Sequence, residues 1–417
     1  MELKQRYQQT ELGLLPEDWE VATIGDRAVK VGSGVTPTGG SRVYKTHGRH
    51  FLRSQNVGWG KLLLDDVSFI DDDIHARFPD TELQPGDVLL NITGASIGRS
   101  AVADDRVSGG NVNQHVCLIR TDSTRLIPAY LNLFLLSRPG QRQIDSFQAG
   151  GNRQGLNFGQ VRSINVPVPS KSEQAAIAGA LSDVDGLIGA LDRLIAKKRD
   201  LKQAAMQQLL TGRTRLPGFK GKWESAALRQ LIAIPVSDGP HMTPVFLSEG
   251  VPFLSVNNLV DGKVSINGLR HVSHEDHLEF ARKCRPVRGD ILLGKAASVG
   301  LVALVDFEWE FNVWSPIAVI RVNSQHVPAF FYYGLQERAV ISQVKLFTNS
   351  SSQGNIGMGD IESLIFSFPT RDEQAAIVQV LSDMDAEISA LESRREKTRL
   401  LKQAMMQALL TGRTRLV

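Results

Sequence analysis

Residues 173–216 read EQAAIAGALSDVDGLIGALDRLIAKKRDLKQAAMQQLLTGRTRL, and residues 373–416 read EQAAIVQVLSDMDAEISALESRREKTRLLKQAMMQALLTGRTRL. The two stretches align without a gap at an offset of 200 residues and share EQAAI, LSD, LKQA and LLTGRTRL. Chance does not produce such agreement, so the chain is a tandem duplication. Solenoid repeats have periods of roughly 20–50 residues. Each copy here is therefore a whole domain followed by a long helix.

Weaker echoes of the duplication occur outside these stretches. Leu15-Pro16 followed by Trp19 corresponds to Leu216-Pro217 followed by Trp223, and Phe51-Leu52 followed by Asn56 corresponds to Phe253-Leu254 followed by Asn257. Gly86-Asp87 corresponds to Gly289-Asp290, and Asn111 followed by Arg120 corresponds to Asn312 followed by Arg321. The helical segments are nearly the same, whereas the larger segments share only this skeleton. We infer that two copies of one scaffold perform the same task on different targets.

The composition is that of an ordinary soluble globular protein, with 42% apolar and 22% charged residues. A length of 417 residues predicts two or three domains. The net charge of +3 permits nucleic-acid binding without requiring it, because a local basic patch matters more than the total. Cys117 and Cys284 form neither a disulfide framework nor a metal-binding pair, and we expect both to be buried. With no apolar run of about 18 residues and no signal peptide, we expect a cytoplasmic protein without membrane contact.

Each repeated stretch has the heptad pattern of a helix that packs against another helix. Apolar residues recur at alternating steps of four and three from Ile177 to Ile195. The second copy keeps the pattern from Ile377 to Leu391 and then turns polar at Arg395. Because the two helices carry matching seams, we favour an antiparallel coiled coil between them over separate packing of each helix on its own domain.

The ends of both helices carry recognisable signals. Ser172 and Asp372 stand where N-cap residues are expected, and Gly212 and Gly412 stand where a glycine closes a helix. A helix of about 38 residues would be roughly 57 Å long at 1.5 Å per residue. We therefore expect a rigid spacer.

Residues 1–170 and 217–371 alternate short apolar runs with turn residues, which is typical of mixed α/β domains. We expect strands at 87–92, 116–120, 290–293 and 317–321, and one amphipathic helix per segment, at 128–147 and 328–347. Polar loops at 32–37, 151–155, 238–241 and 349–354 carry short donors and acceptors that suit phosphates and base edges. Such loops are usually plain turns, but these recur at equivalent places in both copies.

Two motifs that suggest an enzyme or a metal site are set aside. Residues 94–98 (GASIG) fit the G-x-S-x-G nucleophile elbow, but the residues after them predict a returning strand, so we expect a hairpin turn. His271, His274 and His277 have a three-residue spacing, which favours a solvated turn over a zinc site, and the first copy shows no matching histidines. Neither a P-loop nor the amino-methyltransferase tetrapeptide occurs. We expect no catalysis by this chain.

The arrangement of variable domain, helix ending in LLTGRTRL, second variable domain and second helix resembles the specificity subunit of type I restriction-modification systems. The resemblance covers essentially the whole chain. Its most specific parts are the E-Q-x-x-I opening at residues 173–177 and 373–377 and the Leu-Pro-x-x-W-type entry to each domain. It implies a non-catalytic reader of a bipartite, asymmetric site in double-stranded DNA.

The resemblance also implies an architecture and partners. We expect a mixed α/β fold with target recognition domains at 1–170 and 217–371, separated by two long antiparallel helices, 171–216 and 372–417, that form a coiled coil. The helices would set the gap between half-sites, which lie roughly 34–36 Å apart on one face of DNA. They would also dock two modification subunits and the restriction subunits. No cofactor is expected on this chain; S-adenosylmethionine, ATP and Mg would belong to the partner subunits.

On this resemblance we predict DNA-facing residues in both domains. Those of the first domain are Ser33, Thr36, Asn56, Ser96, Asn152, Arg153 and Gln154. Those of the second domain are His241, Thr243, Asn257, Lys295, Ser298, Asn349, Ser351 and Gln353. For Arg213, Arg215, Arg413 and Arg415 we expect contact with either phosphates or solvent.

Two alternatives stay open on the sequence alone. One is the specificity subunit of a related methylation-only system, which neighbouring genes would distinguish. The other is a coiled-coil interaction scaffold without a DNA role, which need not gather polar loops at equivalent places in both domains. A hydrolase is the third and least supported interpretation, and an unchanged activity of Ser96→Ala would exclude it.

Overall fold

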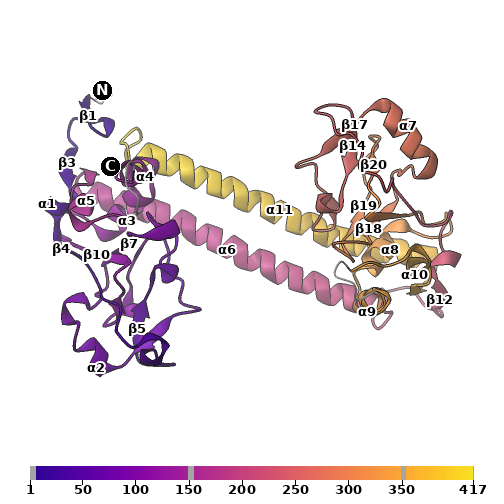
Figure 1. Cartoon of the computed structure of the whole chain (residues 1–417), viewed down its shortest axis with the longest axis horizontal. Coiled ribbons are helices and arrows are strands. Elements are labelled where there is room, and N and C mark those ends of the chain that lie inside the picture. Colours follow the sequence, from indigo (N-terminus) through magenta and orange to yellow (C-terminus); the bar gives the residue numbers. More distant parts are fainter. Residues whose placement is uncertain (1–5, 149–154, 349–353, 417) are drawn as a thin grey trace. The chain divides into compact units, whose positions relative to one another are not determined.

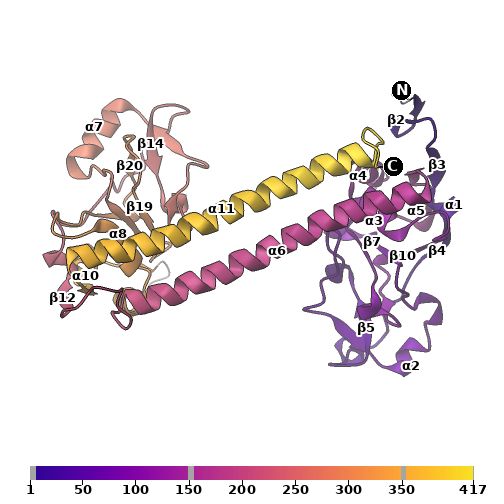
Figure 2. The same cartoon turned by 180° about the vertical axis from the view of Figure 1, so that it is seen from behind.

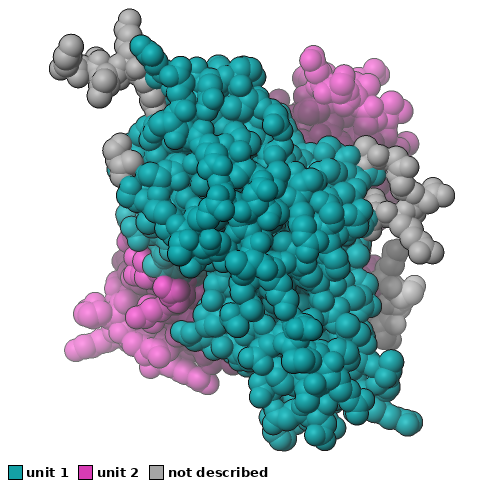
Figure 3. All heavy atoms as spheres, turned by 90° about the vertical axis from the view of Figure 1, so that its left-hand side faces the viewer, with its two compact units in different colours: residues 1–192, 394–417 teal, residues 193–393 magenta. Residues whose placement is uncertain are grey.

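The computed structural model describes residues 6–148, 155–348 and 354–416. The chain divides into two compact units, residues 1–192 with 394–417 (unit 1) and residues 193–393 (unit 2), coloured separately in Figure 3. Each unit contains one variable segment and a part of each long helix. The compact units therefore do not coincide with the four consecutive segments predicted from sequence, because each long helix contributes residues to both units.

The elements of unit 1 are small strands and short helices that precede the first long helix. They are β1 (Tyr7–Thr10), β2 (Gly13–Pro16), β3 (Glu20–Thr23), α1 (Ile24–Arg27), β4 (Ala28–Ser33), β5 (Arg49–Leu52), β6 (Ser68–Ile70), α2 (Asp72–His75), β7 (Val88–Asn91), β8 (Ser100–Val102), β9 (Asn111–Val112), β10 (Val116–Thr121), α3 (Pro128–Leu136), α4 (Arg138–Ser146), α5 (Phe158–Arg162) and β11 (Asn165–Val168). The central sheet has the antiparallel order β4-β10-β7-β8, and a second sheet has the order β6-β5-β9. Figure 1 labels β4, β10 and β7 of the first sheet and β5 of the second.

Unit 2 repeats this topology. Its elements are β12 (Glu224–Ala227), β13 (Ser237–Asp238), β14 (Val251–Leu254), β15 (Leu259–Val260), β16 (Lys263–Val264), β17 (Arg270–Val272), α7 (His274–Lys283), β18 (Ile291–Gly294), β19 (Val302–Leu304), β20 (Asn312–Val313), β21 (Ile317–Ile320), α8 (Pro328–Gly334), α9 (Arg338–Phe347), α10 (Met358–Glu362) and β22 (Ile365–Phe368). The order β13-β21-β18-β19 matches the central sheet of unit 1, and β17-β14-β20 matches its second sheet. The predicted pair of similar mixed α/β domains is confirmed.

The central strands are buried on both faces, which explains their continuous apolar runs. In β7, Val88 and Leu90 join a core with α3 and the long helices, whereas Leu89 faces a second core toward β5 and β9. In β18, Ile291 and Leu292 divide between two cores in the same way. β8 returns antiparallel to β7, so residues 94–98 form the expected hairpin turn and not a nucleophile elbow.

The single helices predicted at 128–147 and 328–347 are each broken in two. In unit 1 the break is at Ser137, whose backbone is extended and whose hydroxyl accepts a hydrogen bond from the Gly140 amide at 3.3 Å. Pro139 follows in the first turn of α4, where its missing N–H costs nothing. In unit 2 Glu337 begins α9 in the same manner, by accepting a hydrogen bond from the Ala339 amide at 2.7 Å. Local capping therefore outweighs the helical periodicity.

The long helices α6 (Lys171–Leu209) and α11 (Arg371–Leu409) run antiparallel to each other within each unit (Figures 1 and 2). Ion pairs join them, between Asp192 and Arg395 and between Asp185 and Lys402 in unit 1, and between Lys198 and Glu387 and between Lys202 and Asp385 in unit 2. Residue numbers rise on one helix as they fall on the other, which confirms the antiparallel pairing. Ile177 and Leu181 also belong to the core of unit 1, so the start of the seam packs on its own domain.

The long helices differ from the prediction at their N-termini. Both helices begin before Ser172 and Asp372, which are therefore not N-caps. At the start of α6 the Ser170 hydroxyl instead accepts a hydrogen bond from the Glu173 amide at 3.2 Å. At the other terminus, Gly212 and Gly412 have φ values of +67° and +65°. A left-handed backbone suits glycine, as expected for residues that close a helix.

The second arginine of each LLTGRTRL motif binds the opening glutamate of the other repeat. In unit 1 the Arg415 guanidinium donates a 2.7 Å hydrogen bond to Glu173, whose carboxylate is fully buried and also accepts from the Trp19 indole at 3.1 Å. In unit 2 Arg215 pairs with Glu373 at 2.5 Å. The expectation that Arg215 and Arg415 face phosphate or solvent is wrong, because both are committed to buried carboxylates. Arg213 and Arg413 are exposed.

Each unit also contains a buried histidine, and the sequence comparison of the two copies missed the one in unit 1. His277 lies on α7, not in a solvated turn, and its Nδ1 is 2.9 Å from the side-chain oxygen of Asn312. His75 lies on α2 in unit 1, and its Nδ1 is 2.7 Å from the equivalent atom of Asn111. The first copy therefore does have a matching histidine. In both units the pair ties a helix to the second sheet.

Cysteine reactivity, metal binding and membrane spans can be assessed for the described residues. Cys117 and Cys284 are buried free thiols, and burial raises the pKa of Cys117 to about 12, which removes its nucleophilic thiolate. Within the described ranges, His, Cys, Asp and Glu form no group of three or more that suits a metal ion. No helix in the described part of the chain is long and apolar enough to cross a membrane.

Candidate nucleic-acid interface

Three loops meet at one end of the central sheet of unit 1. β10 runs antiparallel to both β4 and β7, so its first residues lie beside the last residues of those strands. Cys117 pairs with Ser33, and Val116 pairs with Asn91. The loops at 33–38, 93–98 and 113–115 consequently converge, and we call this surface the loop end of unit 1.

A glycine fixes the first loop in each unit. A Cβ atom on Gly34 would stand 1.5 Å from the Val112 carbonyl oxygen, and one on Gly239 would stand 1.6 Å from that of Val313. No side chain fits at such a separation, so each loop passes against the neighbouring strand only because its residue is glycine. The loops of both units therefore leave the sheet along the same path.

Hydrogen bonds connect the loops of unit 1. The Gln114 side-chain oxygen accepts from the Thr36 amide at 3.0 Å and also from the Thr36 hydroxyl. The Gln114 amide nitrogen lies 3.3 Å from Nε2 of His115, and Thr93 Oγ1 lies 2.6 Å from Nδ1 of the same ring. The loop end of unit 1 thus presents hydroxyl, amide and imidazole groups and no formally charged side chain in this network.

Of the residues predicted to face DNA in the first domain, three lie at this loop end. Thr36 is exposed, and Ser33 and Ser96 are half-buried. Asn152, Arg153 and Gln154 lie outside the described residues, but Gly155, which follows them, is bridged to Thr93. This bridge brings the chain back to the loop end.

The prediction for Asn56 is wrong. Only 1% of this residue is exposed, and its amide nitrogen donates to the carbonyl oxygens of Leu63 and Asp66, both at 2.9 Å. Its side-chain oxygen accepts from the Arg53 amide at 3.0 Å. Because both amide hydrogens are used within the chain and the side chain is buried, Asn56 holds a loop in place and does not reach a base edge.

The loop end of unit 2 is formed by the same strand ends. β21 runs antiparallel to β13 and β18, and Ala318 pairs with Asp238 while Ile317 pairs with Gly294. The converging loops are 238–243, 295–300 and 314–316, which we call the loop end of unit 2. The chain after the second undescribed segment returns here too, through a bridge between Asn355 and Ala296.

A buried carboxylate organises the cations of this loop end. Asp238 is fully buried; its Oδ1 lies 2.5 Å from the Lys283 ammonium, and its Oδ2 lies 3.2 Å from that of Lys295. Nε2 of the exposed His241 lies 3.4 Å from the same Oδ2. One negative charge therefore faces two ammonium groups and an imidazole. The cluster carries excess positive charge, which suits a phosphate or a guanine edge.

The predicted residues of the second domain divide in a similar way. His241 and Thr243 are exposed at the loop end, Ser298 is half-buried there, and Lys295 is buried against Asp238. Asn257 is exposed after β14 and is not equivalent to Asn56. The equivalent residue is Asn258, whose amide donates to the carbonyls of Ser265 and Asn267. Asn349, Ser351 and Gln353 lie outside the described residues.

Sequence reasoning missed four residues that the structure brings to the loop ends. They are Gln114 and His115 in unit 1 and Asp238 and Lys283 in unit 2. The sequence could have indicated two of them, because Gln114 and His115 are polar residues in the short loop between Asn111-Val112 and the predicted strand at 116–120. Lys283 lies far along the chain from Asp238, and only the packing of α7 reveals the contact.

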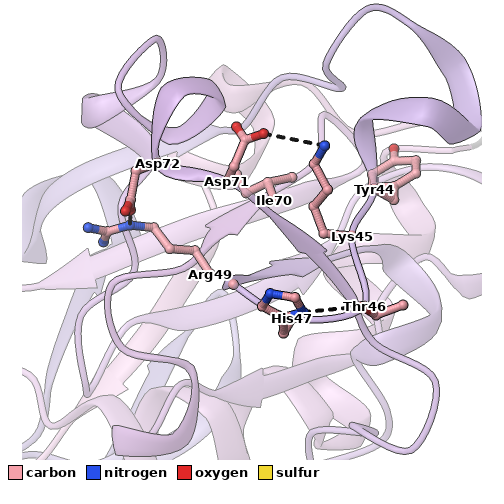
Figure 4. Close-up of a pocket in the computed structure, with 9 residues that line it drawn as sticks. Tyr44, Lys45, Thr46, His47, Arg49, Ile70, Asp71 and Asp72 are labelled. Atoms are coloured by element: carbon pink, nitrogen blue, oxygen red, sulfur yellow. Dashed lines mark hydrogen bonds and ion pairs between the residues drawn. The ribbon is translucent and has the colours of Figure 1, made fainter.

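A cavity of about 800 Å³ lies elsewhere in unit 1, at the second sheet (Figure 4). It is lined by both signs of charge, with Lys45 3.6 Å from Asp71 and Arg49 2.6 Å from Asp72. The hydrogen bond from Arg49 and its positive charge lower the pKa of the Asp72 carboxyl. Because these cations are neutralised within the cavity, it offers less attraction for a polyanion than the loop end of unit 2.

Comparisons with known proteins bear on both units at once. The family described as type I restriction modification DNA specificity domain matches residues 16–197 and again residues 223–401. The putative type I restriction enzyme MjaX specificity subunit of Methanocaldococcus jannaschii is 25% identical over 431 residues, which cover 99% of this chain and 97% of that protein. The EcoKI specificity subunit of Escherichia coli is 22% identical, over 91% of this chain and 85% of its own length.

Solved structures show the same fold. The S subunit of a type I restriction-modification system from M. genitalium superposes with a TM-score of 0.58 at 15% identity, covering 94% of this chain and 96% of that one. A chain in a structure that concerns complex assembly and conformational transition of the type I R-M system superposes with a TM-score of 0.60 at 16% identity. The match covers 95% of this chain and 99% of that one. At these identities the likeness concerns the fold alone.

Proposed function

Because this chain belongs to the type I restriction modification DNA specificity family, we propose that it is the DNA-reading subunit of such a complex and that each unit binds one half of a bipartite site. The observation that carries the proposal is the contrast at the loop ends. The same strand ends present neutral groups in unit 1 and an ammonium cluster in unit 2. Two different surfaces on one scaffold suit two different half-sites.

The side chains at the loop ends suit direct readout of base edges. Glutamine and threonine offer donors and acceptors that match adenine and thymine edges in the major groove, whereas lysine matches the two acceptors of guanine. Contacts to phosphates position a protein on DNA but carry no sequence information. We therefore assign recognition to the loop ends and expect the recognised sequence to be asymmetric.

The chemistry of the assembled complex is proposed to reside in partner subunits. Two modification subunits would bind S-adenosylmethionine and methylate adenine, and restriction subunits would use ATP and Mg to translocate and cut DNA. This assignment is supported by what the described residues offer: the GASIG residues form a hairpin, and burial raises the pKa of the free thiols Cys117 and Cys284. A methylation-only system is the alternative, and the neighbouring genes distinguish it.

The proposal is tested by mapping methylated adenines. The chain is co-expressed with the adjacent methyltransferase gene, and the genome is read by single-molecule sequencing with and without this gene. A split motif that disappears on deletion of this gene supports the proposal. If the methyltransferase is active on another specificity subunit but this chain adds no motif and its complex binds no duplex, the scaffold interpretation replaces it.

We also propose that the length of α6 and α11 sets the number of base pairs between the half-sites. Seven residues extend a helix by about 10 Å, which corresponds to about three base pairs at 3.4 Å each. A matched heptad inserted into both helices, after Ala190 and after Ala390, is therefore expected to lengthen the gap in the methylated motif while both half-sites stay the same. An unchanged gap would contradict this role.

A further inference from the structure

A cleft of about 400 Å³ lies in unit 1 between the start of α4 and the end of α11. These two elements lie side by side in both Figures 1 and 2. Three arginines line the cleft, Arg138, Arg142 and Arg413. None of their guanidinium groups makes a hydrogen bond or an ion pair with another residue in the described part of the chain. Nor is any described lining residue acidic.

The rest of the lining is neutral. Leu12 and Met406 supply apolar surface, and Gln407 and Thr411 on α11 and the turn after it supply an amide and a hydroxyl. Arginine guanidinium groups seldom gather without a counter-charge, because each prefers a bidentate oxyanion. All three arginines are exposed to solvent. Their grouping around one cleft without a carboxylate favours an anionic partner from outside the chain.

Unit 2 differs from unit 1 in this region. A cleft of about 240 Å³ in unit 2 shares with the cleft of unit 1 only the equivalent positions Thr211, Glu337 and Ala339, and no Arg or Lys lines it among the described residues. Glu337 stands there in place of Ser137, is 8% exposed and caps α9 with its own carboxylate. Ser342 replaces Arg142, whereas Arg338 and Arg213 stand at the positions of Arg138 and Arg413 but do not line the cleft of unit 2. Unit 2 thus has one arginine fewer and one carboxylate more at these positions than unit 1.

We propose that the cleft lined by Arg138, Arg142 and Arg413 in unit 1 binds a phosphate group. A backbone phosphate of DNA is one source, and that source rests on the proposed function. Gln141, which lies between Arg138 and Arg142 on α4, donates a 2.9 Å hydrogen bond to the carbonyl of Gly98 in the loop end of unit 1. One side chain thus links the cleft to the candidate interface. A free nucleotide is the other source of the same chemistry.

The test uses the complex of the full chain with its modification subunits. Wild type is compared with a triple variant, Arg138→Ala with Arg142→Ala and Arg413→Ala, and with Ser137→Glu, which brings the carboxylate of unit 2 into the cleft. The matched control is Arg213→Ala with Arg338→Ala, the equivalent positions in unit 2. Binding of a labelled duplex that contains the recognised site is titrated at several KCl concentrations, and binding of inorganic phosphate and of ATP to the chain is followed by ³¹P NMR.

For a DNA phosphate, both cleft variants lose about tenfold or more in duplex affinity. The slope of log affinity against log salt becomes shallower by about 0.9 for each lost phosphate contact, and the control keeps wild-type values. For a free nucleotide, duplex binding is unchanged, whereas ATP or phosphate binds wild type and not the cleft variants. Either result upholds a phosphate site and identifies its source.

Unchanged duplex affinity, salt slope and phosphate binding in both cleft variants would overturn the inference. Thermal unfolding of each variant verifies that it is folded. The gain-of-function variant Glu337→Ser with Ser342→Arg, which gives unit 2 the residues of unit 1 at these two positions, should acquire phosphate binding even if the triple variant does not fold. Failure of the proposed function would give a different result, because the wild-type complex itself would then bind duplexes without sequence preference.

Discussion

The loop ends of the two units stand on the same strand ends but differ in charge. In unit 1 the first loop carries Thr36, hydrogen-bonded to Gln114, and the position after β7 is the apolar Ile92. In unit 2 the equivalent positions hold His241 and Lys295, both within 3.4 Å of the buried Asp238. Sequence divergence between the copies has therefore exchanged a neutral network for a charged one without altering the path of the backbone.

The supporting framework has diverged much less. Arg120 makes two hydrogen bonds with the buried Asp87, at 2.7 and 2.8 Å, and Arg321 makes two with Asp290, both at 2.7 Å. Each aspartate also accepts a backbone hydrogen bond from the turn before its strand. The Arg–Asp pairs that hold the central sheet are therefore the same in both units, whereas the residues in the loops at the end of the sheet differ.

The largest expected effect comes from breaking this shared framework. Arg120→Met leaves the carboxylate of Asp87 buried without its counter-charge, and Arg321→Met does the same to Asp290. Removing one partner of a buried pair typically costs about 3 kcal/mol or more in the free energy of unfolding. Calorimetric unfolding should show losses of similar size for the two variants. A loss confined to one of them would show that the units are not built on an equivalent pair.

A smaller effect should separate the two loop ends. Lys283→Gln and Lys295→Gln each remove an ammonium group from the cluster around Asp238, and we expect each to weaken binding of the recognised duplex about tenfold. The salt slope should fall by about one for each lysine that contacts a phosphate. Fluorescence anisotropy of the full complex at several KCl concentrations measures both quantities.

The matched variants in unit 1 are Thr36→Ala and Gln114→Ala. They remove hydrogen-bonding groups without removing charge, so affinity should fall while the salt slope stays at the wild-type value. If the unit 1 variants change the slope as much as the lysine variants do, the loop ends do not differ in the way that their charges indicate.

The sequence predicted the fold well because the duplication supplied an internal comparison. Strands at 87–92 and 116–120 correspond to β7 and β10, and the two long helices follow from the heptads. The break after α3 was not predicted, because apolar periodicity continues across Ser137 and the break depends on a side-chain cap. Periodicity reports burial, whereas capping depends on a single hydroxyl.

The candidate interface was predicted less completely, for a physical reason. Asn56 looks like a base-reading residue in sequence, but its amide is used to hold the loop that ends near Asp66. Polar residue types alone do not reveal whether their hydrogen bonds are already made within the chain. The partners of Glu173 and Glu373 were equally hidden, because Arg415 and Arg215 lie 242 and 158 residues away along the chain.

The smallest predicted effect concerns one respect in which these two arginine pairs differ. Asp18 adds a second carboxylate to Arg415, with hydrogen bonds of 2.9 and 3.0 Å, and unit 2 has Lys222 at the equivalent position. The hydrogen bond from Arg415 lowers the pKa of the Asp18 carboxyl below its ordinary value of 3.8. A lowered folded-state pKa contributes stability above the unfolded pKa, and this contribution is lost as the pH falls through the folded pKa.

Asp18→Asn should therefore reduce the free energy of unfolding at pH 7 by about 0.5 kcal/mol, since the pair is largely exposed to solvent. The difference from wild type should shrink below about pH 4 and vanish once Asp18 is protonated in both the folded and unfolded states. Lys222→Asn, the matched change in unit 2, should show no such acid-dependent difference. Urea unfolding at pH 7, 5 and 3 measures the contrast, and a constant difference across that range would mean that Asp18 acts through packing and not through its charge.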